Sequence, residues 1–289
     1  QVADDPEANL VEELVVNAKL PGPAWWRVSD ADTTLYILGT LTALPKGVRW
    51  DTSVLDHRLD GAFALILPPE SRAGITDIPA LLGLRNRLKS NQPLDQAAPE
   101  LAPRLAKVRA QLGQKPDSYN GWSPLGAGMM IGIDYQKQAR LDGGEPNRTV
   151  LRLAKKHRVK TRSAAIYKAA PMVKTVVRGH SEAAGRLCLE GVLSEVEAGT
   201  GAVQTAAQAW TQGDVRVAIG GPRNFQRCIR SLPGMSDMEQ RATADEVSAL
   251  AEALNTPGHA VALFSMRGLV AENGVLDQLR AKGFTVRTP

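Results

Sequence analysis

Short apolar runs that alternate with helical patterns at both ends of the chain are the feature that most constrains its fold. Residues 63–67 and 261–264 are apolar runs of strand length. A helical pattern over 51–59 precedes the first run, and another over 274–282 follows the second. Strands that alternate with helices predict a sheet with helices packed on it. We therefore expect an α/β fold whose central mixed sheet is built from N- and C-terminal segments.

A hairpin is predicted near the start of the chain. Trp26 and Val28 precede the polar cluster 29–32, and Leu35 and Ile37 follow it, all at alternate positions. Apolar alternation on both sides of a short polar cluster is typical of two antiparallel strands and their turn. At the other end of the chain, residues 285–287 are expected to form an edge strand.

The middle of the chain predicts a largely helical region, inserted between the two halves of the sheet at roughly 75–215. Its clearest helix has apolar residues at helical spacing over 101–112. A long helix is expected from Ser181 toward Val203. Further on, the spacing of Thr243 and Glu246 is that of a capping box, which predicts the start of a helix there.

The methionine-containing segment 129–131 is open to two interpretations. Met129, Met130 and Ile131 lie among Gly126 and Gly128. Small residues allow close helix packing, and methionine most often fills gaps in a core. Core packing is favoured, and the wall of a groove is the alternative.

Composition excludes several classes of protein. With 43% hydrophobic residues and no long apolar run, the chain is neither disordered nor membrane-spanning. The net charge of +5 owes much to the basic segment 152–162, which lacks interleaved aromatic residues and any nucleic-acid motif. Cys188 and Cys228 permit at most one disulfide, and a buried free thiol is about as well supported as a bridge.

Three segments carry a resemblance to a known family. Residues 23–45, which contain Trp25-Trp26 and Gly39-Thr-Leu-Thr42, resemble the opening of TraB/GumN (Tiki-like) proteins, where a tryptophan-led hairpin runs into a Gly-x-x-His motif. Residues 268–286 are similar to the family's closing segment, and Ala209–Asp214 to its tryptophan, glycine and aspartate element. The resemblance predicts a single TraB/GumN-like α/β domain over 23–289. The weakly patterned, acidic start of the chain and the break at Pro21-Gly-Pro23 predict a lead-in arm over 1–22.

The resemblance also implies a location and a chemistry. Together with the absence of an initiating methionine at Gln1, it leads us to expect an exported protein, periplasmic or secreted, whose leader has been removed. Family members thought to be peptidases would use two histidines and nearby carboxylates to hold a divalent metal such as zinc or manganese. This chain departs from that pattern at each of those positions.

Thr42 stands where the first histidine would be, and Gly268 stands where the second would be. Ser265 replaces the glycine of the second motif. The family's carboxylate falls near Pro68, and Glu70 follows two residues on. A catalytic zinc needs about three imidazole, thiolate or carboxylate donors, which threonine and glycine do not supply. We therefore expect no metal and no other cofactor.

The remaining histidines do not replace the lost ones. The chain has only His57, His157, His180 and His259, and no two of them have the i, i+4 spacing that places two ligands on one helix face. No nucleophile elbow, phosphate-binding loop or dinucleotide fingerprint is present. The sequence thus favours a protein without enzymatic activity but does not decide whether the chain is an enzyme.

Three functions remain, in decreasing order of support. The first is a catalytically degenerate pseudoenzyme that binds an envelope protein, a peptide or another small ligand. The second is a metal-dependent peptidase or other hydrolase with a non-standard site, for which the catalytic candidates are Thr42, Glu70 and Ser265 and the cofactor would be a divalent metal such as zinc or manganese. The third is a basic surface protein that binds acidic polymers. The candidate ligand-binding residues are Gly39, Thr40, Thr42, Arg162, Arg241, Arg267 and Gly268.

Overall fold

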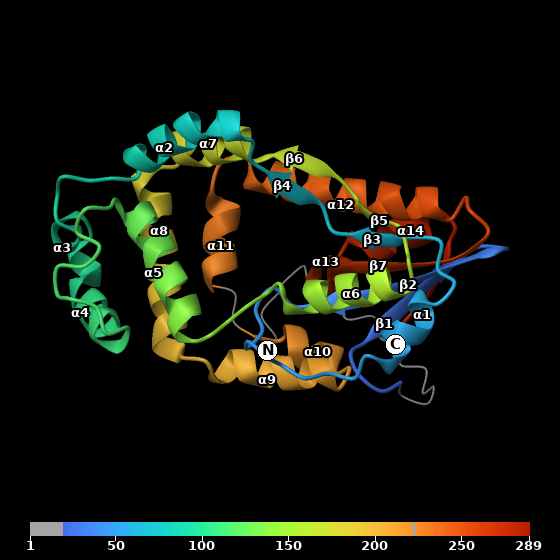
Figure 1. Ribbon diagram of the computed structural model, residues 1–289. Coiled ribbons are helices and arrows are strands. Elements are labelled where there is room, and N and C mark those ends of the chain that lie inside the picture. The colour runs from blue at the N-terminus through green and yellow to red at the C-terminus, as the bar shows by residue number, and fades with distance from the viewer. Residues whose placement is uncertain (1–19, 222–223) are drawn as a thin grey trace.

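The computed structural model describes residues 20–221 and 224–289. Most of the predicted lead-in arm lies outside the described residues. Figure 1 shows the sheet and its covering helices on one side of the molecule, and a group of helices on the other. No helix in the described part of the chain is long and apolar enough to cross a bilayer.

The predicted hairpin is confirmed. Strand β1 (Trp25–Ser29) pairs antiparallel with β2 (Thr33–Thr40), and Trp26 lies opposite Ile37. The turn is held by Asp30, whose Oδ1 accepts hydrogen bonds from the backbone N–H groups of Asp32 at 3.2 Å and Thr33 at 2.9 Å. A short polar side chain that bonds its own backbone in this way is a standard device for closing a turn.

The sheet is mixed and is assembled from both ends of the chain, as predicted. Its strand order is β5-β3-β7-β2-β1-β8. Strands β2, β7, β3 and β5 are parallel to one another, and β8 pairs antiparallel with β1 at the edge. The remaining bounds are β3 (Leu65–Leu67), β5 (Thr161–Ser163), β7 (Gly258–Ser265) and β8 (Thr285–Arg287).

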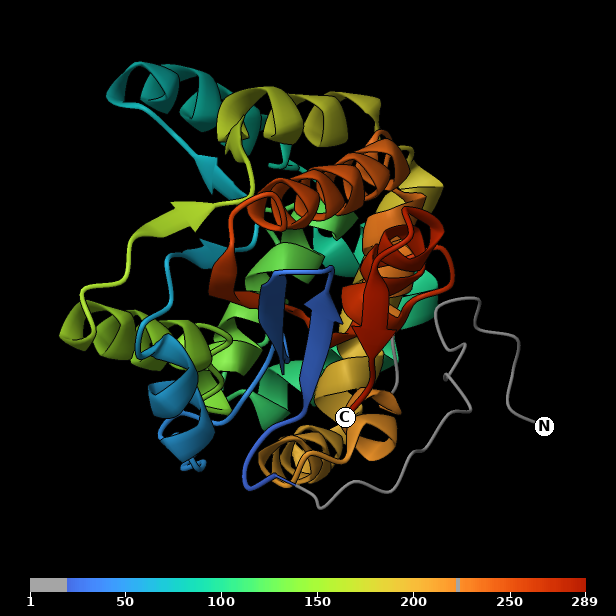
Figure 2. The same cartoon turned by 90° about the vertical axis from the view of Figure 1, so that its right-hand side faces the viewer.

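Helices cover both faces of this sheet, which explains why its strands are continuous apolar runs. Along β7, Phe264 packs on one face and Leu263 on the other. The first face is covered by α9 (Gly201–Thr211), α10 (Val215–Ile219), α12 (Met235–Ala253), α13 (Met266–Val270) and α14 (Val275–Ala281). The second is covered by α1 (Ser53–Leu59) and α6 (Glu145–Lys156), which Figure 2 shows across the strands from α14.

The helical middle region is confirmed, and the helix predicted over 101–112 is α4, which packs with α5 and α8. The region also contains two short strands that were not predicted, β5 and β6, because three-residue strands carry too little periodicity to be recognised. Strand β6 (Ile166–Lys168) pairs in parallel with β4 (Glu70–Arg72) in a separate two-stranded sheet. The helices are α2 (Ile78–Arg87), α3 (Leu94–Ala97), α4 (Ala102–Gln111), α5 (Pro124–Gln138), α7 (Ala169–Gly179), α8 (Glu182–Ala198) and α11 (Asn224–Ser231).

Two helix boundaries were predicted wrongly. The helix from Ser181 ends at Ala198, because Gly199 adopts a left-handed φ of 71° and α9 begins afresh at Gly201. Thr243 does not start a helix but lies inside α12. Its hydroxyl donates to the carbonyl of Glu239, one turn back, at 3.1 Å. A threonine that bonds in this way is compatible with a helix interior, so the capping pattern was misleading.

Cys188 and Cys228 form a disulfide, which decides between the two alternatives left open by the sequence. The bridge links α8 to α11 across 40 residues of sequence. Both cysteines lie in one apolar cluster with Leu125 and Leu232. The bridge therefore fixes α8 to α11, the helix that precedes α12 in the chain.

A buried hydrogen bond connects the end of β2 to α9. Trp210 is fully buried, and its Nε1 donates to the carbonyl of Gly39 at 2.8 Å. A Cβ atom added to Gly39 would lie 2.5 Å from Cζ3 of Trp26, closer than real contacts allow. Close packing against Trp26 thus requires a glycine at position 39, and the carbonyl of Gly39 anchors Trp210.

We predict that Gly39→Ala lowers the free energy of unfolding by about 1–3 kcal/mol, the usual cost of overpacking a core. Gly268→Ala is the matched control, because a Cβ there meets nothing within 4 Å. Urea unfolding followed by tryptophan fluorescence measures both. Equal stabilities for the two variants would contradict the packing role of Gly39.

We also predict that Cys188→Ser/Cys228→Ser lowers the free energy of unfolding by roughly 2–4 kcal/mol, because the bridge closes a loop of 40 residues and restricts the unfolded chain. Thermal unfolding with and without a reductant provides the measurement. The reductant should lower the Tm of the parent protein and leave that of the double variant unchanged.

Candidate functional site

A large cavity lies at the carboxyl ends of the parallel strands. Its volume is about 860 Å³. The residues that directly follow β2 (Leu41 and Thr42) and β3 (Pro68 and Pro69) line it, as does Arg267 just after β7. Because parallel strands end at one edge, the loops that follow them meet there, which is where open α/β sheets characteristically bind ligands.

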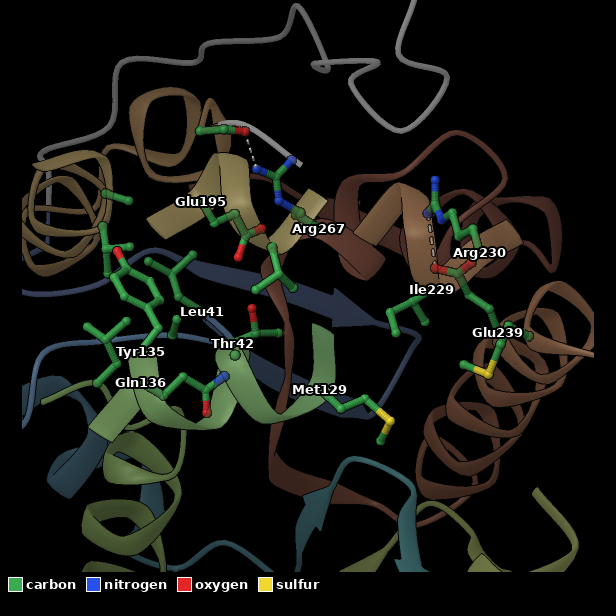
Figure 3. Close-up of a pocket in the computed structure, with 18 of the residues that line it drawn as sticks. Leu41, Thr42, Met129, Tyr135, Gln136, Glu195, Ile229, Arg230, Glu239 and Arg267 are labelled. Atoms are coloured by element: carbon green, nitrogen blue, oxygen red, sulfur yellow. Dashed lines mark hydrogen bonds and ion pairs between the residues drawn. The ribbon is translucent and has the colours of Figure 1, made fainter. Parts of the chain in front are cut away.

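The opposite wall of the cavity is formed by the helical group. Figure 3 shows Met129 and Gln136 of α5, Glu195 of α8 and Ile229 of α11 around it. Met129 and Ile133 are 45% and 56% exposed and lie one turn apart on the same face of α5. Large exposed apolar side chains in a concave site are typical of ligand pockets.

Helix α5 combines the two roles that its sequence left open. Gly128 is packed against the backbone of α8, where an added Cβ would lie 3.3 Å from the Cα of Leu189. Ile131 is fully buried in the helical core, whereas Met129 lines the cavity. The segment is therefore both core and groove wall, since a helix packed on one side can present an apolar face on another.

Several polar side chains lie within the otherwise apolar wall of the cavity. Arg230 Nη2 donates to Glu239 Oε1 at 3.0 Å, which joins α11 to α12. Arg267 Nη2 donates to the carbonyl of Gly221 at 3.2 Å. Figure 3 shows these two arginines at separate places on the rim of the pocket. Charged groups that are held by the protein can orient a ligand without dominating its binding.

Glu246 of α12 also lines the cavity and is electrostatically unusual. Burial raises the pKa of its carboxyl group from 4.5 to about 7. Across the described residues, its side chain makes no hydrogen bond and no ion pair. A carboxyl group without a partner in an apolar cavity wall holds its proton near neutral pH, because burial penalises the charged form.

Beside it, Tyr167 donates a hydrogen bond to Asp245 at 2.5 Å. Burial, reinforced by this hydrogen bond, raises the pKa of the Tyr167 hydroxyl to about 12. Tyr167 is the middle residue of β6, the partner strand of β4, and lines the cavity. This part of the site therefore combines a neutral phenol with a weakly acidic carboxyl group.

The residues predicted at the first motif are divided between the cavity and the core beneath it. Thr42 lines the cavity. Gly39 is packed against Trp26, and Thr40 is buried, with its hydroxyl donating to the carbonyl of Phe264 at 3.1 Å. These two residues position the loop that begins at Leu41.

At the second motif, Arg267 lines the cavity, whereas its neighbours Ser265 and Gly268 do not. Ser265 is the N-cap residue of α13, although its side chain makes no capping hydrogen bond. Gly268 has open space around its Cα. Thr42 and Gly268 therefore do not face each other across the cavity as a pair of ligands would.

The other candidates are engaged in the scaffold. Glu70 forms an ion pair with Arg72 and accepts from Ser163 at 3.1 Å, while the cavity is lined by the residues on either side of it. Arg162 pairs with Glu252 at 2.9 Å. None of these side chains lines the cavity.

Arg241 is likewise outside the cavity lining. Its guanidinium lies 5.3 Å from the ring centroid of Tyr167 and 3.9 Å from Asp245. In the predicted basic segment, Lys156 and His157 both contact Asp56, at 3.0 and 2.8 Å. Part of the charge of that segment is thus neutralised within the protein.

The donor set of the site does not fit a catalytic metal. Among residues 20–221 and 224–289, no three His, Cys, Asp or Glu side chains are grouped so that they could hold an ion. The ring nitrogens of His180 and His259 lie 3.0 and 3.1 Å from backbone carbonyl oxygens. The three cavity carboxylates, Glu195, Glu239 and Glu246, come without an imidazole, which zinc sites require more often than not.

Sequence reasoning missed Glu195, Glu239 and Glu246. The local pattern assigned Glu246 to a helix cap, and nothing in the spacing of the others distinguishes them from solvent-facing residues of a helix. Only the packing of α8 and α12 around a common space brings them together.

Residues 24–288 match the TraB/PrgY/gumN family, which covers the sheet, both tryptophan elements and the whole cavity. No curated protein and no solved structure matches the chain. The match spans the segments that build the scaffold as well as the motif positions where Thr42 and Gly268 stand. The chain belongs to the TraB/PrgY/gumN family.

Proposed function

We propose that the protein binds an apolar ligand, or the apolar side chains of a peptide or protein, in its central cavity and that it does so in the cell envelope without catalysing a reaction. The observation that carries the proposal is the 860 Å³ cavity at the carboxyl edge of the sheet. This volume falls within the range of about 300–1,000 Å³ that is usual for ligand sites.

The chemistry of the cavity wall favours a flexible apolar ligand. Four of the six methionines line it, namely Met129, Met172, Met235 and Met238. Methionine is unbranched and polarizable, so a methionine-rich surface adapts to ligands of different shape. Leu41 and Ile133 extend the same surface. An apolar segment of a polypeptide suits this wall better than a sugar or a nucleotide.

The absence of reactive groups at the motif positions supports a binding role. Thr42 and Gly268 offer no ligand comparable to imidazole, and fold and activity are separable within a family. An envelope location rests on the family resemblance and suits a protein held by the Cys188–Cys228 disulfide, since disulfides persist in oxidising compartments.

Glu246 favours a second candidate, a hydrolase with a non-standard site. A carboxyl group whose pKa is about 7 is matched to general acid-base catalysis at neutral pH. It lines the cavity together with Thr42, the only hydroxyl group of the first motif that does so. This candidate requires turnover that Glu246→Gln abolishes.

The binding proposal predicts that Ile133→Glu weakens the binding of Nile red, a neutral apolar dye, by at least about tenfold, because a charge placed in an apolar site is costly. Fluorescence titration measures the Kd. Leu82→Glu is the matched control, since Leu82 is 54% exposed, compared with 56% for Ile133, and lies on α2 outside the cavity lining.

Two results would count against the proposal. One is equal Nile red affinity of the Ile133→Glu and Leu82→Glu variants, which would place dye binding outside the cavity. The other is turnover of peptide or ester substrates, tested with zinc, manganese or cobalt and with a chelator. Turnover that Glu246→Gln removes would establish the second candidate instead.

The environment of Glu246 predicts a pH-dependent stability. The native carboxyl group keeps its proton up to about pH 7, whereas the ordinary pKa is 4.5, so Glu246 stabilises the fold less and less as pH rises through this window. Glu246→Gln should therefore raise the free energy of unfolding at pH 8 by on the order of 2 kcal/mol, and change it little near pH 4.

Urea unfolding at the two pH values tests this. The exposed Glu272→Gln serves as the control for removing one negative charge. A gain of stability that is the same at both pH values, or the same for the two variants, would contradict the predicted environment of Glu246.

A further inference from the structure

A second, smaller cavity gathers three arginines from distant parts of the chain. Its volume is about 180 Å³. Arg27 comes from β1, Arg58 from α1 and Arg287 from β8. The other lining residues are Leu20, Gly22, Pro23, Ala24, Trp25, Gly213, Thr288 and the last residue of the chain, Pro289. It shares no lining residue with the central cavity. The two sites are therefore separate.

The pairing of the strands explains why these side chains meet. Arg27 lies directly opposite Tyr36 on β2 and directly opposite Arg287 on β8. Side chains at paired positions of adjacent strands lie on the same face of a sheet. Arg58 reaches this face from α1, and its Cζ atom lies 4.4 Å from the ring centroids of both Trp25 and Tyr36.

The cavity has positive groups and no negative side chain in its lining. In the part of the chain that the structure describes, none of the three arginines forms an ion pair. Arg27 and Arg287 repel each other, because like charges directly opposite on antiparallel strands destabilise the pair. A bound anion would attract both guanidinium groups and so offset their mutual repulsion.

Arg58 has one donor atom that the described residues leave without a hydrogen bond. Its Nη1 is buried and has no hydrogen-bond partner. A buried donor without a partner costs free energy, more so when it is charged. The two flanking rings hold the guanidinium plane in place, so little side-chain entropy would be lost on binding. Burial lowers the pKa of Arg58 to about 10, which leaves it charged at neutral pH.

We propose that Arg27, Arg58 and Arg287 form a binding site for a small oxyanion of the phosphate class, either inorganic phosphate or a phosphate monoester. Guanidinium forks donate paired hydrogen bonds to phosphate oxygens, and a tetrahedral dianion can accept from three arginines at once. A carboxylate, with one charge and two oxygens, would satisfy fewer of these donors.

The test is a calorimetric titration of the intact protein with sodium phosphate and with glycerol 3-phosphate, at constant ionic strength set by sodium chloride. We expect saturable binding of at least one of the two. Binding of phosphate alone would identify the free ion as the ligand, and tighter binding of the ester would identify a phosphorylated molecule. Sodium acetate should bind at least about tenfold more weakly.

Variants at the two exposed strand positions localise the site without disturbing the stacked Arg58. Arg27→Gln and Arg287→Gln should each raise the Kd for phosphate at least about tenfold. Arg152→Gln, an exposed arginine on α6, removes the same charge elsewhere and should leave the Kd unchanged. In phosphate-free buffer, Arg27→Gln should raise the Tm, because it removes the repulsion from Arg287.

The opposite results would overturn the proposal. Absence of saturable binding of either phosphate compound would do so, as would acetate binding as tightly as phosphate. Equal losses for Arg152→Gln and Arg27→Gln would show that the anion responds only to net charge. A phosphate-dependent rise in Tm that persists in both Arg27→Gln and Arg287→Gln would place the anion elsewhere on the protein.

Discussion

The parallel pairing of β2 with β7 is the interaction on which the rest of the structure depends. It runs from Thr33 opposite Gly258 to Thr40 opposite Ser265, and joins segments more than two hundred residues apart. Neither strand has a buried environment without the other. Because the two strands are parallel, they end at the same edge, so Thr42 and Arg267 enter the same cavity. The hydrogen bond from Trp210 to the carbonyl of Gly39 then ties the last part of β2 to α9.

The helical region acts as the far wall of the site rather than as a separate body. One face of α5 is buried against α8 through Gly128, and another face presents Met129 to the cavity. The disulfide joins α8 to α11, and the ion pair of Arg230 with Glu239 joins α11 to α12, the helix that carries Glu246. The cavity therefore has walls from both halves of the fold, which explains its mixture of strand-end loops and helical methionines.

The chain belongs to the TraB/PrgY/gumN family and carries Thr42 and Gly268 at the positions where the resemblance implies histidines, which is why we propose a binding function. Gly39 and Trp210 are needed by the packing of the sheet, so they remain whatever the site does. Thr42 lines the cavity instead. The arginine cluster on the opposite side of the hairpin shows that one strand, β1, can serve the core with Trp26 and a charged surface cavity with Arg27.

Local patterns in the sequence determined the strands of the hairpin, the apolar runs of β3 and β7, the helix α4 and the mixed sheet built from both ends. They could do so because the periodicity of apolar residues is a property of residues that are neighbours in the chain. Sequence reasoning also named Thr42 and Arg267 among its candidate residues, and both line the cavity. Only the tertiary structure decided that Cys188 meets Cys228, that Thr243 lies inside a helix, that Glu246 faces an apolar cavity and that Arg58 is stacked between Trp25 and Tyr36. These outcomes depend on contacts between residues far apart in the chain, and the free energy of a buried charge or a bridged thiol is set by those distant neighbours.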